Sequence, residues 1–319
     1  MKRGAAAALV FATTLTGCLG EDPISDIATF VLDPPDWVEA EVAVPAYSSD
    51  LATNPSESAV TVRFHAGGGF TVDFTDAGDP RTVSVTDFDI VEVGSLAGGN
   101  SHIYETADGE RLELVVSLDT PTALARLDLD AATALGYETY AVIGEHMPSD
   151  NLPTGNATYV GTMVASLSVD GEVPDLDATG GPDTQYDTIT GRAEIRFLFG
   201  GGPTDLPGVE ATFDQLEMTD PSTGSPIAIV GQIDGNIGVL DVTGDDRALY
   251  RMGISAELTI PGIVGPGPGP EVFYQGDRIG GFFGATGDAT AGTFQATGDV
   301  MPDEPVPAIV GGYLATQTP

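Results

Sequence analysis

Alternation of apolar and polar residues dominates the second half of the chain and predicts β-strands. In the run 190–199 every second position is small or apolar, and the positions between them carry Arg192, Glu194 and Arg196. Successive side chains of a strand point to opposite faces, so one face of this run packs into a core and the other meets water. Eight such runs follow one another, at 157–169, 186–199, 208–218, 227–240, 248–260, 271–283, 290–299 and 307–316.

Eight consecutive strands of this kind predict a small antiparallel β-barrel. Closure removes the exposed sheet edges, and at eight strands the interior is filled by side chains. Gly231, Gly235 and Gly238 are then expected at sharp bends, and the Gly-Pro run 262–270 is expected to be a long loop at one rim. The predicted outward faces carry charges, which argues against a barrel embedded in lipid.

The first half of the chain also predicts strands, at 59–65, 70–74, 82–93 and 111–118. The stretch Pro121 to Leu135 fits either a short helix capped by Thr120 or a further strand through Leu124, and we predict the helix. Residues 148–157 are polar and broken by proline, so we place a domain boundary there. The predicted fold is therefore all-β, with a small N-terminal domain followed by the barrel.

The first residues resemble a bacterial lipoprotein signal. Lys2 and Arg3 give a positive start, residues 4–14 are a short apolar run rich in alanine, and Leu15-Thr16-Gly17-Cys18 resembles a lipobox. The apolar run is too short to span a bilayer. We therefore predict a signal peptide at 1–17 and acylation of Cys18, with residues 18–56 as a lipid-anchored tether that docks partway onto the fold.

Charge excludes one large class of function. Removing residues 1–17 lowers the basic count from 11 to 9 against 48 acidic residues, a formal charge of −39, and leaves no lysine. A field of this sign repels nucleic acid, so nucleic-acid binding is excluded. Cys18 is the only cysteine, so no disulfide forms within the chain. The acidic surface also resembles that of proteins adapted to salty water, a habitat that we treat as a hypothesis.

Two short segments near the C-terminal end combine glycine with aromatic residues. They are Ile279-Gly-Gly-Phe-Phe-Gly284 and, after six residues, Ala291-Gly-Thr-Phe294. Together they resemble the signature hairpin of the transferrin-binding protein B type of β-barrel lipoprotein. The segment 153–161 is similar to the start of its barrel, and 136–141 to the last strand of its handle domain. The resemblance implies a β-rich handle at 57–150 and an eight-stranded barrel at 151–319.

The resemblance also implies a place and partners. It implies an outer-membrane lipoprotein displayed at the cell surface, with a periplasm-facing orientation as the alternative. Its implied partners are a TonB-dependent outer-membrane transporter or a surface-lipoprotein translocon. The chain departs from the family by having one lobe, few basic residues and modest loops, so transferrin itself is not the expected ligand.

Residues that could carry chemistry are few. His65, His102 and His146 lie on separate segments without metal-ligand spacing, so we predict no metal site. Some relatives in the superfamily bind haem, but nothing local marks one histidine for that role, and we predict no cofactor. Asp175-Leu-Asp177 begins like a calcium loop, yet Tyr186 stands where a glutamate is required. Because no nucleophile elbow, phosphate loop or dinucleotide motif is present, we predict that the protein is not an enzyme.

Two classes of function remain. The preferred one is a surface lipoprotein that binds a nutrient or a macromolecule for a membrane receptor. The other is an acidic structural or interaction module of the cell envelope with no small ligand. A cluster of exposed aromatic side chains at a barrel rim would favour the first class, and the candidates are Phe273, Tyr274, Phe282 and Phe283.

Overall fold

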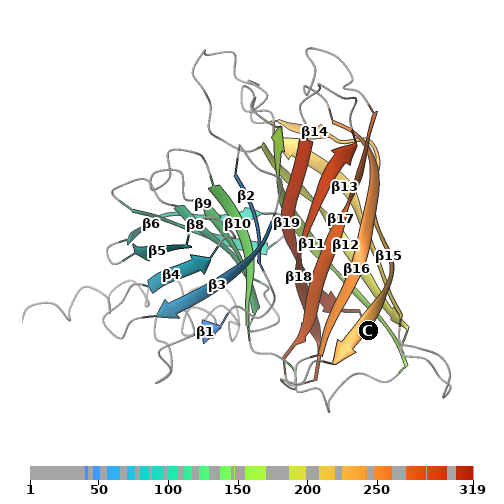
Figure 1. The fold of residues 1–319 in the computed structure, drawn as a ribbon, viewed down its shortest axis with the longest axis horizontal. Helices are drawn as coiled ribbons and strands as arrows, with labels where there is room; N and C mark the ends of the chain where they lie inside the picture. Colours follow the sequence, from blue (N-terminus) through green and yellow to red (C-terminus); the bar gives the residue numbers. More distant parts are fainter. Residues whose placement is uncertain are drawn as a thin grey trace, which may run out of the picture.

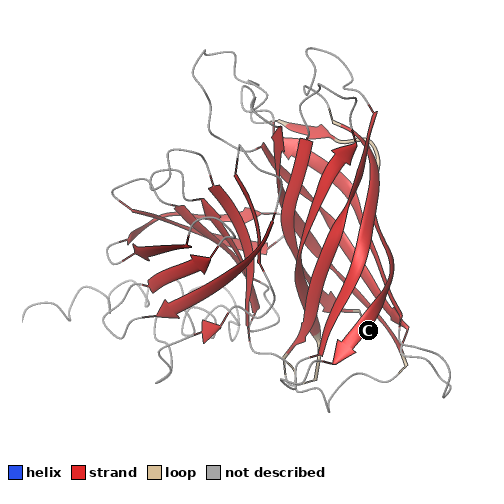
Figure 2. Cartoon of the chain, viewed as in Figure 1, coloured by secondary structure: helices blue, strands red, loops and turns tan. Residues whose placement is uncertain are grey.

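The computed structural model describes most of the strands of the chain and few of the connections. The described residues are 40–41, 46–50, 56–64, 70–75, 80–85, 88–96, 99–106, 111–116, 122–128, 137–144, 147, 155–169, 187–198, 208–219, 225–242, 248–260, 271–284, 286–299 and 307–318. Every regular element within these ranges is a strand (Figure 2). In these ranges we find no helix with the length and apolar character needed to cross a membrane.

Ten strands form an N-terminal antiparallel sheet, which lies on the left in Figure 1. Its order is β5-β4-β3-β2-β10-β9-β8-β7-β6, and β1 pairs with β3. The strands are β1 Ala40–Glu41, β2 Ala46–Asp50, β3 Ser56–Phe64, β4 Phe70–Thr75, β5 Pro80–Val85, β6 Phe88–Leu96, β7 Gly99–Thr106, β8 Arg111–Val116, β9 Thr122–Asp128 and β10 Tyr137–Gly144.

The predicted helix after Thr120 is wrong, because Thr122–Asp128 forms strand β9. Neighbouring strands decide the matter: β8 and β10 pair with β9 on its two sides, and these long-range hydrogen bonds override the weak local helix signal. The predicted run 82–93 is divided between β5 and β6. β1 and β2 lie within the segment predicted to be a tether.

Eight long strands form the closed antiparallel barrel that the alternation predicts. Their order is β12-β11-β19-β18-β17-β16-β15-β13, and pairing of β12 with β13 closes the ring. The short strand β14 is added to β13. The strands are β11 Asn156–Val169, β12 Asp187–Leu198, β13 Gly208–Thr219, β14 Pro226–Ala228, β15 Ile233–Val242, β16 Ala248–Thr259, β17 Glu271–Phe283, β18 Ala289–Asp299 and β19 Pro307–Gln317.

Irregularities in the ladder adjust which side chains face the interior. On β13, Phe213 and Leu216 both point inward, because Gln215 has a positive φ of 53° and forms a bulge opposite β12. The register between β15 and β16 also shifts after Gly235. Gly231 has a φ of 121°, and a Cβ there would lie 2.2 Å from the carbonyl oxygen of Glu257, so glycine is required at this bend.

The N-terminal sheet packs against the outer wall of the barrel at β18 and β19 (Figure 1). Tyr140 donates or accepts a buried hydrogen bond of 2.6 Å with Ser166 of β11, and the amide of Met147 donates to the carbonyl of Phe282 over 3.0 Å. Outward positions that would be polar on a free barrel are apolar under this contact. The buried cluster is Leu124, Tyr140, Val142, Val164, Ile279, Phe283, Ala289, Ala291, Val310 and Leu314.

Candidate functional site

The interior of the barrel is filled with packed side chains. Phe197 packs among three other rings, with ring centroids 5.3 Å from Tyr159, 5.1 Å from Tyr250 and 4.4 Å from Phe282. Across the interior, Phe213 stacks on Phe294 at 5.2 Å. All six rings are buried, as expected for the close packing of a protein core. The described interior therefore resembles a solid core more than a carrier cavity.

Glycines of the predicted signature hairpin make room for tyrosines. A Cβ on Gly280 would lie 2.1 Å from Tyr313 Oη and 2.4 Å from Tyr250 Oη, and one on Gly292 would lie 2.3 Å from Tyr313 Oη. The two tyrosines thus reach the interior through space that any other residue at these positions would occupy. This close approach gives a physical reason for the Gly-Gly-Phe-Phe pattern, because only a residue without a Cβ leaves space for the phenols.

A short chain of hydroxyl groups lies between these strands. Thr290 Oγ1 donates to the carbonyl of Gly281 over 2.9 Å, and Tyr250 Oη lies 2.5 Å from Thr290 Oγ1. Tyr250 also bonds Tyr313 through the two phenols. Because the Thr290 hydroxyl donates its only proton to the carbonyl of Gly281, Tyr250 donates to Thr290, and Tyr313 donates to Tyr250. Burial raises the pKa of Tyr313 well above its usual range, so its phenol stays neutral.

One arginine is enclosed with these tyrosines. Arg278 of β17 is 1% exposed, and its guanidinium lies over the rings of Tyr313, Tyr250 and Phe213 at 4.3, 5.3 and 5.4 Å. Arg278 belongs to none of the motifs that the sequence singled out. The signal was available, since Arg278 takes an inward position in the alternation of β17, between the buried Tyr274 and Phe282.

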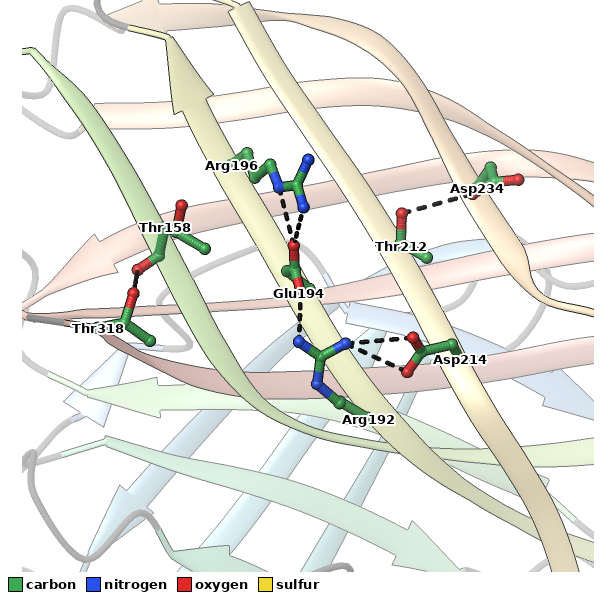
Figure 3. Close-up of polar contacts among 8 residues, drawn as sticks. All are labelled: Thr158, Arg192, Glu194, Arg196, Thr212, Asp214, Asp234 and Thr318. Atoms are coloured by element: carbon green, nitrogen blue, oxygen red, sulfur yellow. Dashed lines mark hydrogen bonds and ion pairs between the residues drawn. The ribbon is translucent and has the colours of Figure 1, made fainter.

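The outer wall carries a ladder of charges on β12 and β13 (Figure 3). Glu194 bonds both Arg192 and Arg196, and Arg192 reaches Asp214 over 3.1 Å. Hydrogen bonds from Arg192 and Arg196 lower the pKa of Glu194 below its usual range. Carboxylates neutralise both arginines of this ladder, so the ladder presents no free basic patch for an acidic ligand. Because its side chains are partly exposed to water, the ladder stabilises the fold only slightly.

The rim that carries β14 presents exposed apolar side chains beside acids. Phe273 is 43% exposed, and on the outer face it stands directly between Glu257 of β16 and Asp299 of β18, both exposed. Val230 is 69% exposed and pairs with Thr259, which in turn pairs with Glu271 of β17. We call Val230, Glu257, Glu271, Phe273 and Asp299 the rim patch.

Of the four aromatic residues that the sequence offers as candidates for an exposed cluster, one is exposed. Phe273 is exposed, whereas Tyr274, Phe282 and Phe283 are fully buried. Tyr274 and Phe282 point into the barrel core, and Phe283 lies under the N-terminal sheet. Alternation separates Phe273 from Tyr274, and coverage by the sheet, which the sequence does not reveal, buries Phe283.

The other residues that the sequence singled out are not brought together. Cys18, His65, His146 and the segment 175–183 lie outside the described residues, and His102 lies in β7 with its side chain outside the description. Among the described residues, no group of histidine, cysteine and acidic side chains could hold a metal ion. The acylation of Cys18 stays a prediction.

Comparison with known proteins gives likeness at the level of the fold. No protein-family model matches the chain, and no curated protein matches its sequence. Transferrin-binding protein B from Haemophilus parasuis, in a tryptophan-to-alanine mutant, is similar in structure, with 16% identity, a TM-score of 0.39 and coverage of 83% of this chain and 54% of that chain. The same protein from Neisseria meningitidis gives 14% identity, a TM-score of 0.40 and coverages of 83% and 53%.

A further similar structure is a protein of unknown function from Nostoc punctiforme, with 10% identity, a TM-score of 0.25 and coverages of 88% and 96%. This chain spans about half the length of the transferrin-binding proteins, 54% in the first case.

Proposed function

We propose that this chain is a lipid-anchored, non-catalytic binding protein of the outer membrane that captures a nutrient or macromolecular ligand for a membrane receptor. The lipobox ending at Cys18 supports the anchor. The packed interior of the barrel carries the proposal on the ligand, because it leaves the outer surface as the place of contact. The protein therefore grips its partner from outside and does not enclose it.

The rim patch is the part of that surface best suited to a partner. An exposed aromatic ring attracts a cation over its face, and Glu257 and Asp299 place carboxylates on both sides of Phe273. The formal charge of the mature chain also draws basic partners towards it. We propose that the patch receives lysine or arginine side chains of a protein ligand, with Phe273 as the anchor.

Delivery to a receptor rests on the resemblance alone. A TonB-dependent transporter and a surface-lipoprotein translocon are the partners that it implies, and cell-surface display is the corresponding location. The alternative is the acidic envelope module without a ligand of its own, which the high negative charge would serve equally well.

The anchor is tested by metabolic labelling with a radioactive fatty acid. The wild-type chain should incorporate label and sediment with outer membranes, whereas Cys18→Ala should remain unlabelled. Label retained by Cys18→Ala would contradict the lipobox assignment.

The ligand surface is tested with an arginine-rich peptide as the probe, titrated into the purified chain at low and moderate salt. Phe273→Ser, and the pair Glu257→Gln with Asp299→Asn, should each weaken binding at least threefold at moderate salt. Leu198→Ser is the matched control. Leu198 is 41% exposed and lies at the end of the barrel opposite β14. Equal affinity for all these variants would refute the rim patch and favour the alternative function.

A further inference from the structure

Arg278 is an ionised group held inside the barrel, and three strands besides its own surround it. Tyr313 comes from β19, Tyr250 from β16 and Phe213 from β13, so the guanidinium lies between strands on different sides of the interior. An arginine in a protein keeps its proton, so this side chain carries a full positive charge in a region without solvent.

Most of the donors of that guanidinium find no acceptor among the described residues. Among the described residues, Nη2 donates to Tyr250 Oη over 3.4 Å, at the long limit of such a contact. Nε and Nη1 are buried, and neither has a hydrogen-bond partner in the part of the chain that the structure describes. These two atoms carry three of the five N–H groups of the side chain, and a buried polar group without a partner is costly.

The described surroundings do not supply a counter-charge. No described carboxylate forms an ion pair with Arg278, although the chain has 48 acidic residues. Tyr313 cannot serve as a phenolate, because burial keeps its pKa well above the usual range. The ring faces give part of the missing stabilisation, since aromatic faces attract cations, but they accept no directed hydrogen bond from Nε or Nη1.

We infer that Arg278 holds a small inorganic anion, of the halide class, inside the barrel. Nε and Nη1 provide the donors, and the tyrosine and phenylalanine rings close the site from water. The ion supplies both the acceptors and the charge that the described side chains do not. The packed rings of Phe197, Phe213 and Phe294 exclude an extended organic ligand from the same interior.

This inference is independent of the proposed function, since it concerns the interior and the rim patch lies on the outer wall. It gives the acidic chain a specific anion requirement, in addition to any general effect of cations on its surface. Stability should accordingly depend on which anion is present, and at equal ionic strength screening by salt cannot produce such a difference.

Crystals of the protein grown or soaked with sodium bromide give a direct test. Anomalous scattering at the bromine absorption edge should show a peak within hydrogen-bond distance of Nε and Nη1 of Arg278. Density at that place without an anomalous signal, as a water molecule would give, overturns the inference, and so does continuous packing without any density.

Melting temperature gives a test in solution. In sodium bromide or chloride the wild-type chain should melt several degrees above its value in sodium gluconate at the same ionic strength, and the difference should saturate with concentration. The difference should vanish in Arg278→Met and persist in Arg251→Met, which removes an exposed arginine of the neighbouring strand. If Arg278→Met does not fold, the bromide crystals decide the question alone.

Discussion

Replacing Gly280 by alanine tests the packing of the barrel interior in one step. The added Cβ would lie 2.1 Å from Tyr313 Oη, about 1.3 Å inside the ordinary contact distance of 3.4 Å. It would also lie 2.4 Å from Tyr250 Oη and 2.5 Å from Tyr250 Cζ. Both phenols belong to fully buried rings, so neither can move aside into solvent.

The cost has two parts. Overpacking a core by a methyl group costs about 1–3 kcal/mol, and weakening one buried hydrogen bond between the phenols adds roughly 1 kcal/mol. We therefore expect Gly280→Ala to lower the free energy of unfolding by about 2–4 kcal/mol. For a unit of 150–250 residues, each kcal/mol lowers the melting temperature by about 2–4 °C.

A double-mutant cycle identifies the cause. Tyr313→Phe removes the oxygen nearest to the new methyl group, so Gly280→Ala should cost about 1 kcal/mol less in that background than in the wild type. Gly284→Ala is the control, because Gly284 has a φ of +82° and no atom within 4 Å of the position of its Cβ. Backbone strain alone should make that control cost about 1 kcal/mol, with no coupling to Tyr313.

Urea unfolding followed by far-UV circular dichroism measures the free energies of the four proteins of the cycle and of the two that carry Gly284→Ala. Two results would refute the reasoning. Gly280→Ala could be as stable as the wild type within about 0.5 kcal/mol, which lies below the smallest cost expected of overpacking. Alternatively, the costs of Gly280→Ala and Tyr313→Phe could simply add, which would mean that the methyl group and the phenol do not meet.

Three further predictions address charge, pH and domain organisation. The chain without residues 1–17 should melt at higher temperature as sodium chloride rises from 0.01 to 1 M, because the screening length falls from about 30 to about 3 Å. A melting temperature that does not change would contradict the salty-habitat hypothesis. Stabilisation by micromolar calcium alone would instead indicate a calcium site in the loop at 175–183. The hydrogen bonds from Arg192 and Arg196 lower the pKa of Glu194, so their contribution to the stability of the fold is present above the ordinary carboxyl pKa and is lost as pH falls through the lowered pKa. Glu194→Gln should therefore weaken the loss of stability at acid pH, and an unchanged loss would contradict the assignment. Limited proteolysis should cut between 148 and 156 and release a folded, strand-rich fragment, whereas a fragment that unfolds at once would show that the two parts depend on each other.

Period-two patterning located seven of the eight barrel strands to within one residue at each end, whereas the predicted run 227–240 is divided between β14 and β15. The predicted runs 271–283 and 248–260 coincide with β17 and β16 to within one residue. This worked because each barrel strand has one buried and one wet face, so burial is written into the sequence with the period of the strand. The charged outer positions Arg192, Glu194 and Arg196 followed from the same rule.

Local pattern failed where the outcome depended on a distant neighbour. The segment after Thr120 is equally compatible with a helix and a strand, and pairing with β8 and β10 made it β9. Phe283 occupies an outward position of β17 and would be exposed on an isolated barrel, yet the N-terminal sheet covers it. The local sequence of a segment does not reveal which distant segment it will contact.

The sequence by itself determined the barrel and the acidic composition, because each depends on a local pattern or on residue counts. The lipid anchor at Cys18 stays a prediction. Only the tertiary structure decided what fills the barrel and what surrounds Arg278. The arginine, its three rings and the phenol chain come from β13, β16, β17, β18 and β19, and ring closure brings these strands around one interior. The free-energy cost of burying the charge of Arg278 arises because these strands together enclose it, and no single segment of the chain would exclude water from it.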